Sequence, residues 1–297
     1  MLNPHVVAET LFQFKMFFLE NSIKTYTLPS IFIEPDQNIF RMTGKDTISF
    51  LDRISTNKIV ISDDITSSKT ILTNNKGSIV EVVKYKILDS ENLIFTFNSN
   101  NSETINYLNN YIILEDVKII LENKVSKVSF FSKRENIPSE LINHSYITNL
   151  DKSEDLFRYE LFVEKKILTK ILNLQSLNIL SKLEKNFLEI SMKLFDYESN
   201  LSKINPLETG FENFISFDKG CYVGQEVIAR LHNYKKISRE IIYFKSEEIF
   251  KINDYFKNKK GISGKILSIE KINNYYLGLC LIKKKYITLL NENYIFI

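Results

Sequence analysis

The sequence predicts an α+β sandwich with antiparallel sheets and packed helices, followed by a small C-terminal β-barrel. Up to about residue 131, short apolar strands, turn residues and amphipathic segments lack the regular strand–helix alternation of a parallel sheet. From about residue 239, short β segments are separated by turns rich in Asn, Lys and Gly, a pattern typical of a small closed barrel.

The first elements follow from the spacing of apolar residues. Residues 46–54 (DTISFLDRI) begin with an acid and carry apolar side chains at positions 48, 50, 51 and 54, which predicts a short amphipathic helix. Residues 70–88 hold two apolar runs around the turn sequence NNKG, which predicts a β-hairpin. The other elements expected here are strands at 31–33, 39–42 and 92–98, a helix at 102–114 and a strand-rich stretch at 118–131.

The rest of the chain shows less distinct boundaries. We expect a strand at 157–167, helices at 169–179 and 183–194, and barrel strands at 241–245, 262–269, 275–282 and 294–297. Three parts are predicted: a helical N-terminal extension at 1–30, a main region of two subdomains at 31–236, and the barrel domain at 237–297. Lys15 interrupts the apolar stretch 11–19, which lacks a basic leader and a cleavage site, so we expect a packed helix there and not a signal peptide.

Composition argues against several classes of protein. The 297 residues carry 39 basic and 36 acidic side chains, a balance that is unusual for a dedicated nucleic-acid-binding protein. No apolar run reaches the roughly 18–20 residues of a membrane span, and two cysteines fit a reducing compartment, so a cytoplasmic protein is expected. The three histidines are far apart in sequence, so this chain alone is not expected to hold a metal site, and a cluster would share ligands with a partner.

Residues 219–226 (KGCYVGQE) are the most informative stretch of the chain. Gly220 and Gly224 each weaken a regular element by roughly 0.5–1 kcal/mol, so they indicate a sharp turn that would expose Cys221. Lys219, together with the N–H groups of a helix beginning near Gly224, would favour the thiolate. A lone cysteine is more often a small buried hydrophobe, and the residues by themselves leave both interpretations open.

The neighbours of this octet admit more than one role. Tyr222 can stack on a planar ligand or cover the motif, while Gln225 and Glu226 can bind loop N–H groups, cap the following helix or contact a ligand. The basic residues around the octet form either a solvated surface or an attraction site for a polyanion. They are Lys219, Arg230, Lys235, Lys236 and Arg239. Cys280 lies in an alternating strand pattern (YLGLCLI) and is expected to be a packing residue.

The octet resembles the KGCYxGQE signature of the YgfZ family, which is related to the folate-dependent T-protein of the glycine cleavage system. The flanking stretches NPLE at 205–208, FD at 217–218 and VIAR at 227–230 are also similar to that family. Weaker similarities are RMTGKDTISFL at 41–51, the KG turn at 76–77, and residues 264–268 and 278–282, which resemble the family's C-terminal barrel. The resemblance covers about residues 31–290, and the octet is its specific part.

The resemblance implies a T-protein-like folate-binding domain with tetrahydrofolate in a central pocket and Cys221 exposed at its rim. It implies an accessory protein, more a non-enzymatic assembly factor than an enzyme, that supports assembly or repair of iron–sulfur clusters in client enzymes, including tRNA-modifying ones. The expected partners are these clients, cluster-assembly proteins and tRNA. Cys221 would supply a soft iron ligand or a redox thiol. Arg230 and Tyr197 are the candidate folate contacts.

Two stretches depart from the T-protein pattern. Glu81 and Val82 stand where T-proteins carry adjacent aspartates, and the stretch that corresponds to the family's Arg-Ile-Glu-x-Gly pattern reads EISMK at 189–193. Aminomethyl transfer needs a carboxylate near the reacting nitrogen, so these departures argue against that activity and against folate affinity. Two alternatives stay open: a tetrahydrofolate-dependent aminomethyl or one-carbon transferase, and a tRNA-binding module. The chain has no tryptophan, so stacking on a pterin would require tyrosine or phenylalanine.

Overall fold

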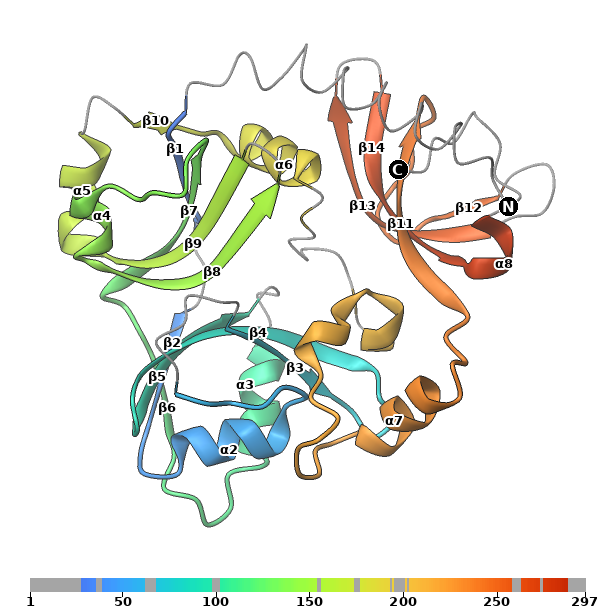
Figure 1. Ribbon diagram of the computed structural model, residues 1–297, viewed down its shortest axis with the longest axis horizontal. Coiled ribbons are helices and arrows are strands. Elements are labelled where there is room, and N and C mark those ends of the chain that lie inside the picture. The colour runs from blue at the N-terminus through green and yellow to red at the C-terminus, as the bar shows by residue number, and fades with distance from the viewer. Residues whose placement is uncertain are drawn as a thin grey trace.

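Three β-sheets surround the middle of the computed structural model, two with five strands and one with four (Figure 1). The structure describes residues 28–35, 39–61, 68–97, 102–153, 156–173, 177–192, 194, 201, 203–257, 263–272 and 275–287. The predicted helix within 1–30 therefore lies almost wholly outside the described residues, as does the predicted strand 294–297. The division into three parts at 1–30, 31–236 and 237–297 stays a prediction.

The first sheet has the strand order β3–β4–β5–β2–β6 and its described pairs are antiparallel. Its strands are β2 (Ile39–Thr43), β3 (Lys69–Thr73), β4 (Ile79–Asp89), β5 (Asn92–Phe97) and β6 (Lys118–Leu121). Helices α2 (Thr47–Ile54) and α3 (Ser102–Asn109) cover one face. Phe50, Leu51 and Ile54 recur at helical spacing on α2 and are buried against that face, which is why this segment is a helix.

The second sheet has the order β10–β1–β7–β9–β8, in which β1 and β10 are parallel and the other pairs antiparallel. Its strands are β1 (Ser30–Ile33), β7 (Val125–Ser132), β8 (Ser145–Ser153), β9 (Leu156–Glu164) and β10 (Asn178–Ile179). Helices α4 (Ser139–Ile142) and α5 (Lys165–Leu172) pack on one face, and α6 (Lys182–Ser191) packs on the other.

The predicted hairpin, the helix at 46–54 and the strand at 92–98 are confirmed, whereas other boundaries differ. The helix predicted at 169–179 is wrong in its C-terminal part, because the buried pair Ile167 and Ile171 places α5 at Lys165–Leu172 and Asn178–Ile179 is a strand. The helix predicted at 102–114 ends at Asn109. The stretch 118–131 splits into β6 and β7, which belong to different sheets, and the sequence predicted neither α4 nor β8.

The C-terminal sheet has the antiparallel order β11–β14–β13–β12, followed by the short helix α8 (Lys284–Ile287). Its strands are β11 (Arg239–Ser246), β12 (Tyr255–Lys257), β13 (Ser263–Ile272) and β14 (Tyr275–Lys283). Within the described residues β11 and β12 are the two edges of this sheet, so the predicted closure into a barrel is not confirmed. The α+β class with largely antiparallel sheets is confirmed.

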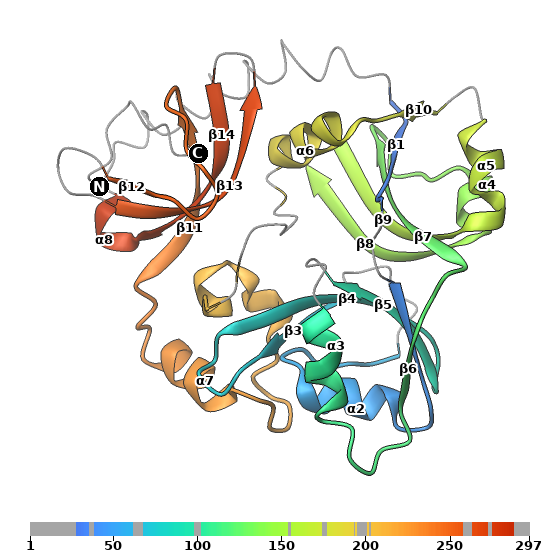
Figure 2. The ribbon, with the colours of Figure 1, turned by 180° about the vertical axis from the view of Figure 1, so that it is seen from behind.

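The first sheet shares a hydrophobic core with the C-terminal sheet. Ile71 and Val82, on the face opposite α2, pack with Leu279 and Leu281 of β14. The connecting segment contributes to this core through Phe211 and holds the 3₁₀ helices η2 (Pro206–Glu208) and η3 (Phe211–Phe214), then α7 (Gln225–Asn233). Figure 2 shows from behind that the second and C-terminal sheets both lie on this side of the first sheet, away from α2. Among the described residues, none of the helices combines the length and apolar character of a membrane span.

Candidate functional site

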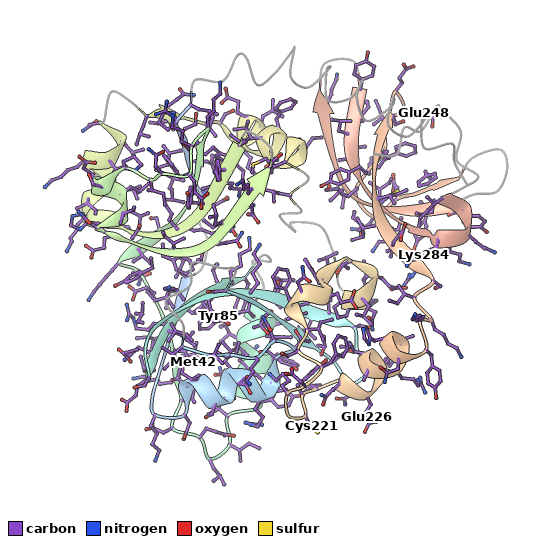
Figure 3. The ribbon with its side chains drawn as sticks, viewed as in Figure 1. Met42, Tyr85, Cys221, Glu226, Glu248 and Lys284 are labelled. Atoms are coloured by element: carbon purple, nitrogen blue, oxygen red, sulfur yellow. The ribbon has the colours of Figure 1, made fainter. Side chains whose placement is uncertain are left out.

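The octet 219–226 forms a turn that leads from η3 into α7. Its cysteine, Cys221, is exposed, and Figure 3 shows it near Glu226 at the lower edge of the molecule, below the first sheet. Cys280 of β14 is fully buried, as the alternating pattern predicted, and burial raises the pKa of its thiol. The two cysteines of this chain therefore occupy opposite environments, and Cys221 is the one that a reagent or partner can reach.

Lys219 reaches from the turn to the C-terminal end of α2. Its Nζ donates to the backbone oxygens of Asp52, Ser55 (3.0 Å) and Asn57 (2.8 Å), and it lies 3.2 Å from Oδ1 of Asp52. The side chain is only 2 % exposed. A helix leaves its last carbonyl groups without intrahelical partners and carries partial negative charge there, so a buried ammonium satisfies both. Lys219 therefore anchors the turn to α2.

These contacts change the role expected for Lys219. Burial lowers the pKa of Lys219, although the carboxylate of Asp52 acts in the opposite direction. The ammonium also lies 5.8 Å from the ring centre of Tyr222, within cation–π range. Its hydrogen bonds go to the oxygens of residues 52–57, so they support a structural role and add nothing in favour of the predicted role beside the thiol of Cys221.

Gly224 holds the turn against the β3–β4 hairpin. Its φ is +82° and that of Gly77 is +66°, both in the left-handed region that glycine adopts without strain. A Cβ on Gly224 would lie 2.3 Å from the backbone oxygen of Asn74 and 2.9 Å from Cα of Gly77. Gly220 differs, because its φ is outside that region and a Cβ there would meet nothing within 4 Å. The predicted shaping of the loop by glycine therefore applies to Gly224 and not to Gly220.

Further hydrogen bonds join the octet to the β3–β4 hairpin, and the hairpin to the NPLE stretch. The hydroxyl of Thr73, at the end of β3, donates to the backbone oxygen of Val223. Nδ2 of Asn205 donates to the backbone oxygen of Gly77 at 2.9 Å, and its Oδ1 accepts from the N–H of Leu207 at 3.0 Å. The octet and the NPLE stretch are thus both tied to the β3–β4 hairpin, which carries the KG turn, and together they form one unit.

Tyr222 lies beneath this unit. Its side chain is buried with Leu207, Ile215 and Ile228, and burial raises the pKa of its phenol to about 12. The phenolic oxygen has no hydrogen-bond partner among the described residues. Of the two roles expected for Tyr222, this packing supports covering the motif.

The remaining motif residues lie on α7. Gly224 is its N-cap residue, without a side-chain cap, and the exposed Glu226 stands in the first turn, where a carboxylate is stabilised by the helix dipole. Arg230 is exposed one turn further along α7. Of the other basic residues, Arg239 pairs with Glu208 at 2.6 Å, which ties β11 to the NPLE stretch. Tyr197, the second candidate folate contact, lies outside the described residues.

A contact between α7 and the start of the turn was not predicted from the sequence. The imidazole of His232 stacks on the ring of Phe217, with centroids 4.1 Å apart, and its Nε2 lies 3.0 Å from Oε1 of Glu212. The phenylalanine of the FD stretch was the only signal for it. Over the ranges that the structure describes, no three His, Cys, Asp or Glu side chains gather in a metal-binding arrangement.

A buried charge cluster, also missed, lies between the first and second sheets. Glu160 of β9 is fully buried and contacts Lys84 of β4 at 2.7 Å and Arg158 at 2.8 Å. Arg158 lies 3.2 Å from Glu189 of α6, whose other oxygen is 2.8 Å from Lys185. Buried charges at this density require partners, because an unpaired charge is strongly disfavoured in a low-dielectric interior.

The signal for this cluster was in β9 itself. The strand reads LFRYELFVE, and side chains of successive strand residues point to opposite faces. Phe157, Tyr159 and Leu161 join the core under α4 and α5, so Arg158 and Glu160 face the first sheet. Charges alternating with apolar residues normally indicate a solvated face, and only the neighbouring sheet turns this face into an interior.

Comparisons with known proteins show which proteins this chain resembles in sequence and in fold. No family model matches the chain. The tRNA-modifying protein YgfZ of Buchnera aphidicola subsp. Baizongia pistaciae is 24 % identical over 285 residues, which cover 84 % of this chain and 86 % of the relative. The crystal structure of glycine cleavage system aminomethyltransferase T from Bartonella henselae matches with a TM-score of 0.70 at 11 % identity, over 86 % of this chain and 79 % of the other. These findings confirm the resemblance: the chain is similar to a YgfZ protein over most of its length and has a T-protein-like fold.

Proposed function

We propose that this chain is a folate-dependent accessory protein for the assembly or repair of iron–sulfur clusters in client enzymes, including tRNA-modifying ones. One observation carries the proposal: Cys221 is exposed on a turn that Lys219 ties to α2 and Gly224 ties to the β3–β4 hairpin. Similarity to the tRNA-modifying protein YgfZ supports the setting of tRNA modification. On this proposal the protein acts in the cytoplasm, more as a non-enzymatic assembly factor than as an enzyme.

An exposed thiol on a rigid turn is suited to a partner's metal centre. The thiolate is the form that ligates iron or exchanges electrons, and sulfur is a soft ligand for iron. When it ligates iron, the thiol releases its proton to solvent, and its sulfur donates an electron pair to the iron in place of an earlier ligand. Because the turn is already tethered, little conformational entropy is lost when this sulfur binds a partner's iron. The other iron ligands belong to the client enzyme or to a cluster-assembly protein.

Tetrahydrofolate would be held by the buried charge cluster. A pterin offers ring N–H donors that a carboxylate accepts, and its glutamate tail needs cations. Glu160, Glu189 and Arg158 would bind it by exchanging the ion pairs that they make within the cluster for contacts with the ligand. When bound, tetrahydrofolate supplies one-carbon or redox chemistry, and these side chains bind and orient it. Cys221 belongs to the turn that is anchored at α2. Helix α2 packs on one face of the first sheet, and Lys84 of the cluster lies on the opposite face. With folate at this cluster, the thiol and the folate would act at separate places.

A deletion strain tests the role of the thiol. It is assayed for several iron–sulfur enzymes, including one that modifies tRNA, after complementation with wild type or Cys221→Ser. The serine change is nearly isosteric at an exposed position, so we expect normal protein levels and loss of support for the enzymes. Full rescue by Cys221→Ser would defeat the assignment.

The alternative of a tetrahydrofolate-dependent one-carbon transferase is favoured by the fold shared with an aminomethyltransferase. One observation argues against it: the buried carboxylate of Glu81 accepts a hydrogen bond from the N–H of Val82 at 2.9 Å, so it is already engaged by the backbone and is not placed to handle a substrate proton. Purified protein with bound tetrahydrofolate and an aminomethyl donor decides the matter, and the absence of turnover removes this alternative.

The alternative of a tRNA-binding module makes a separate prediction. Binding through phosphates releases counterions, so affinity for tRNA would fall steeply as salt rises. Weak binding with a flat salt dependence would exclude it.

A further inference from the structure

A cavity of about 380 Å³ lies at the junction of the first and second sheets. It is lined by Arg41 of β2, Lys124 just before β7, Tyr146 of β8, and Glu164, Lys165 and Lys166, where β9 passes into α5. Figure 1 shows α5 and α7 on opposite sides of the molecule, so this cavity is remote from the octet. Its volume falls near the lower end of the range for small-molecule sites, which is about 300–1,000 Å³.

Two of its lysines are brought together by strand register. Val125 pairs with Glu164 across β7 and β9, and the backbone N–H of Lys165 donates to the backbone oxygen of Lys124 at 2.8 Å. Within the described part of the chain, no carboxylate lies within 4.0 Å of either ammonium group. The charge of Lys124 also acts on Glu122, but neither lysine has a carboxylate in contact, so a bound anion would relieve the local positive potential.

The other charged groups of the cavity are paired. Arg41 binds Oε2 of Glu122 at 2.8 Å, and Lys166 lies 2.7 Å from Glu164. Four cationic side chains against one carboxylate in the lining therefore leave positive charge centred on Lys124 and Lys165. The first turn of the eight-residue helix α5 also lines the cavity, and its N-cap residue Glu164 makes no side-chain cap. The helix dipole adds to the attraction of an anion there.

Tyr146 adds an aromatic surface to this anion site. The residue lines the cavity and is 36 % exposed, so a ligand in the cavity can reach its ring. We propose that the cavity binds a nucleoside monophosphate, free or as the 5′-terminal nucleotide of an RNA, with the phosphate at Lys124 and Lys165 and the base against Tyr146. This site is independent of the function proposed for Cys221. Stacking on an aromatic side chain accepts any base, so we expect little base preference.

Calorimetric titration of the full chain with the four common nucleoside monophosphates tests this site. We expect binding that weakens with salt, at least about tenfold weaker binding of adenosine or inorganic phosphate alone, and a loss of at least about tenfold for K124Q/K165Q. The control K251Q/K271Q removes two exposed lysines elsewhere and should bind like wild type. Tyr146→Ala should weaken binding of the nucleotide and leave binding of inorganic phosphate unchanged.

Undiminished binding by K124Q/K165Q, or no nucleotide binding by wild type at low salt, would overturn the site. Equal affinity for inorganic phosphate and nucleotide would overturn the nucleotide assignment. Short RNAs with and without a 5′-phosphate distinguish the two sources. Competition by the 5′-phosphorylated RNA alone supports an RNA end, and failure of both RNAs to displace a bound nucleotide supports the free nucleotide.

Discussion

Gly224 of the cysteine-bearing turn packs directly on Gly77 of the β3–β4 hairpin, with no room for a Cβ on Gly224. Such an atom would lie 2.9 Å from Cα of Gly77 and 2.3 Å from the oxygen of Asn74. At the other end of the turn, the ammonium group of Lys219 donates hydrogen bonds to backbone oxygens at the C-terminal end of α2 and just beyond it. The position of Cys221 is thus set by contacts with the first sheet and its helix, far away in sequence.

Gly224→Ala is expected to destabilise the protein by about 2–4 kcal/mol, because it combines a left-handed φ with a clash against backbone atoms. Gly220→Ala is the matched control. It meets nothing within 4 Å and restricts the unfolded chain, so it should be neutral or stabilise by about 0.4–1 kcal/mol. Denaturant unfolding of both variants measures the difference, and equal stabilities would contradict the close approach of Gly224 to Gly77.

Lys219→Met should cost about 1–3 kcal/mol, because it leaves the backbone oxygens at the end of α2 without their donor. Lys76→Met, which changes an exposed lysine on the adjacent hairpin turn, serves as the control and should stay within about 0.5 kcal/mol of wild type. Thermal unfolding compares the two. If both variants match wild type, the anchoring role of Lys219 is wrong.

Iodoacetamide should modify Cys221 in the native protein and leave Cys280 unmodified until the chain unfolds. Cys221 is exposed, whereas Cys280 is fully buried and its thiol pKa is raised by burial, so both access and the thiolate fraction favour Cys221. Peptide mass spectrometry over a time course locates the label. Modification of Cys280 at a similar rate under native conditions would show that the C-terminal sheet packs differently.

Tyr222→Phe should leave stability within about 0.5 kcal/mol of wild type or raise it slightly, since the buried phenolic oxygen has no hydrogen-bond partner among the described residues. Tyr222→Ala removes the ring from its contacts with Leu207 and Ile228 and should cost about 3–5 kcal/mol. Support of iron–sulfur enzymes in the deletion strain should survive the phenylalanine change. Its loss in a stable Tyr222→Phe protein would assign the hydroxyl a ligand contact.

Glu122→Gln should destabilise the protein by roughly 1 kcal/mol near neutral pH. Burial acts to raise the pKa of Glu122, but the N–H of Lys124 and the guanidinium of Arg41 outweigh it and hold the pKa below its ordinary 4.5. A depressed pKa stabilises the fold above the ordinary value and loses this contribution as the pH falls through the folded value. The difference in Tm between wild type and Glu122→Gln should therefore shrink below pH 4.5. The exposed control Glu91→Gln should show no such trend.

Local patterns predicted much of the first sheet, because the apolar residues that α2 and the hairpin bury lie within a few positions of one another in the sequence. Phe50, Leu51 and Ile54 recur at helical spacing, and the NNKG turn separates two apolar runs. The helix predicted at 169–179 was misplaced, because Ile167, one of the two buried apolar residues that define α5, lies before the predicted start. It also could not separate β6 from β7, since a run of strand-forming residues does not reveal which sheet it joins.

By itself, the sequence determined the class of fold, the octet and the family that the octet resembles, since these depend on short-range spacing and on residue types. Only the tertiary structure decided which partners particular residues contact: Lys219 binds the end of α2, Gly224 packs on Gly77, and Arg158 and Glu160 face another sheet. The physical reason is that hydrogen bonds, close packing and ion pairing depend on partners distant in the chain. A sequence shows which groups need such partners, and the fold supplies them.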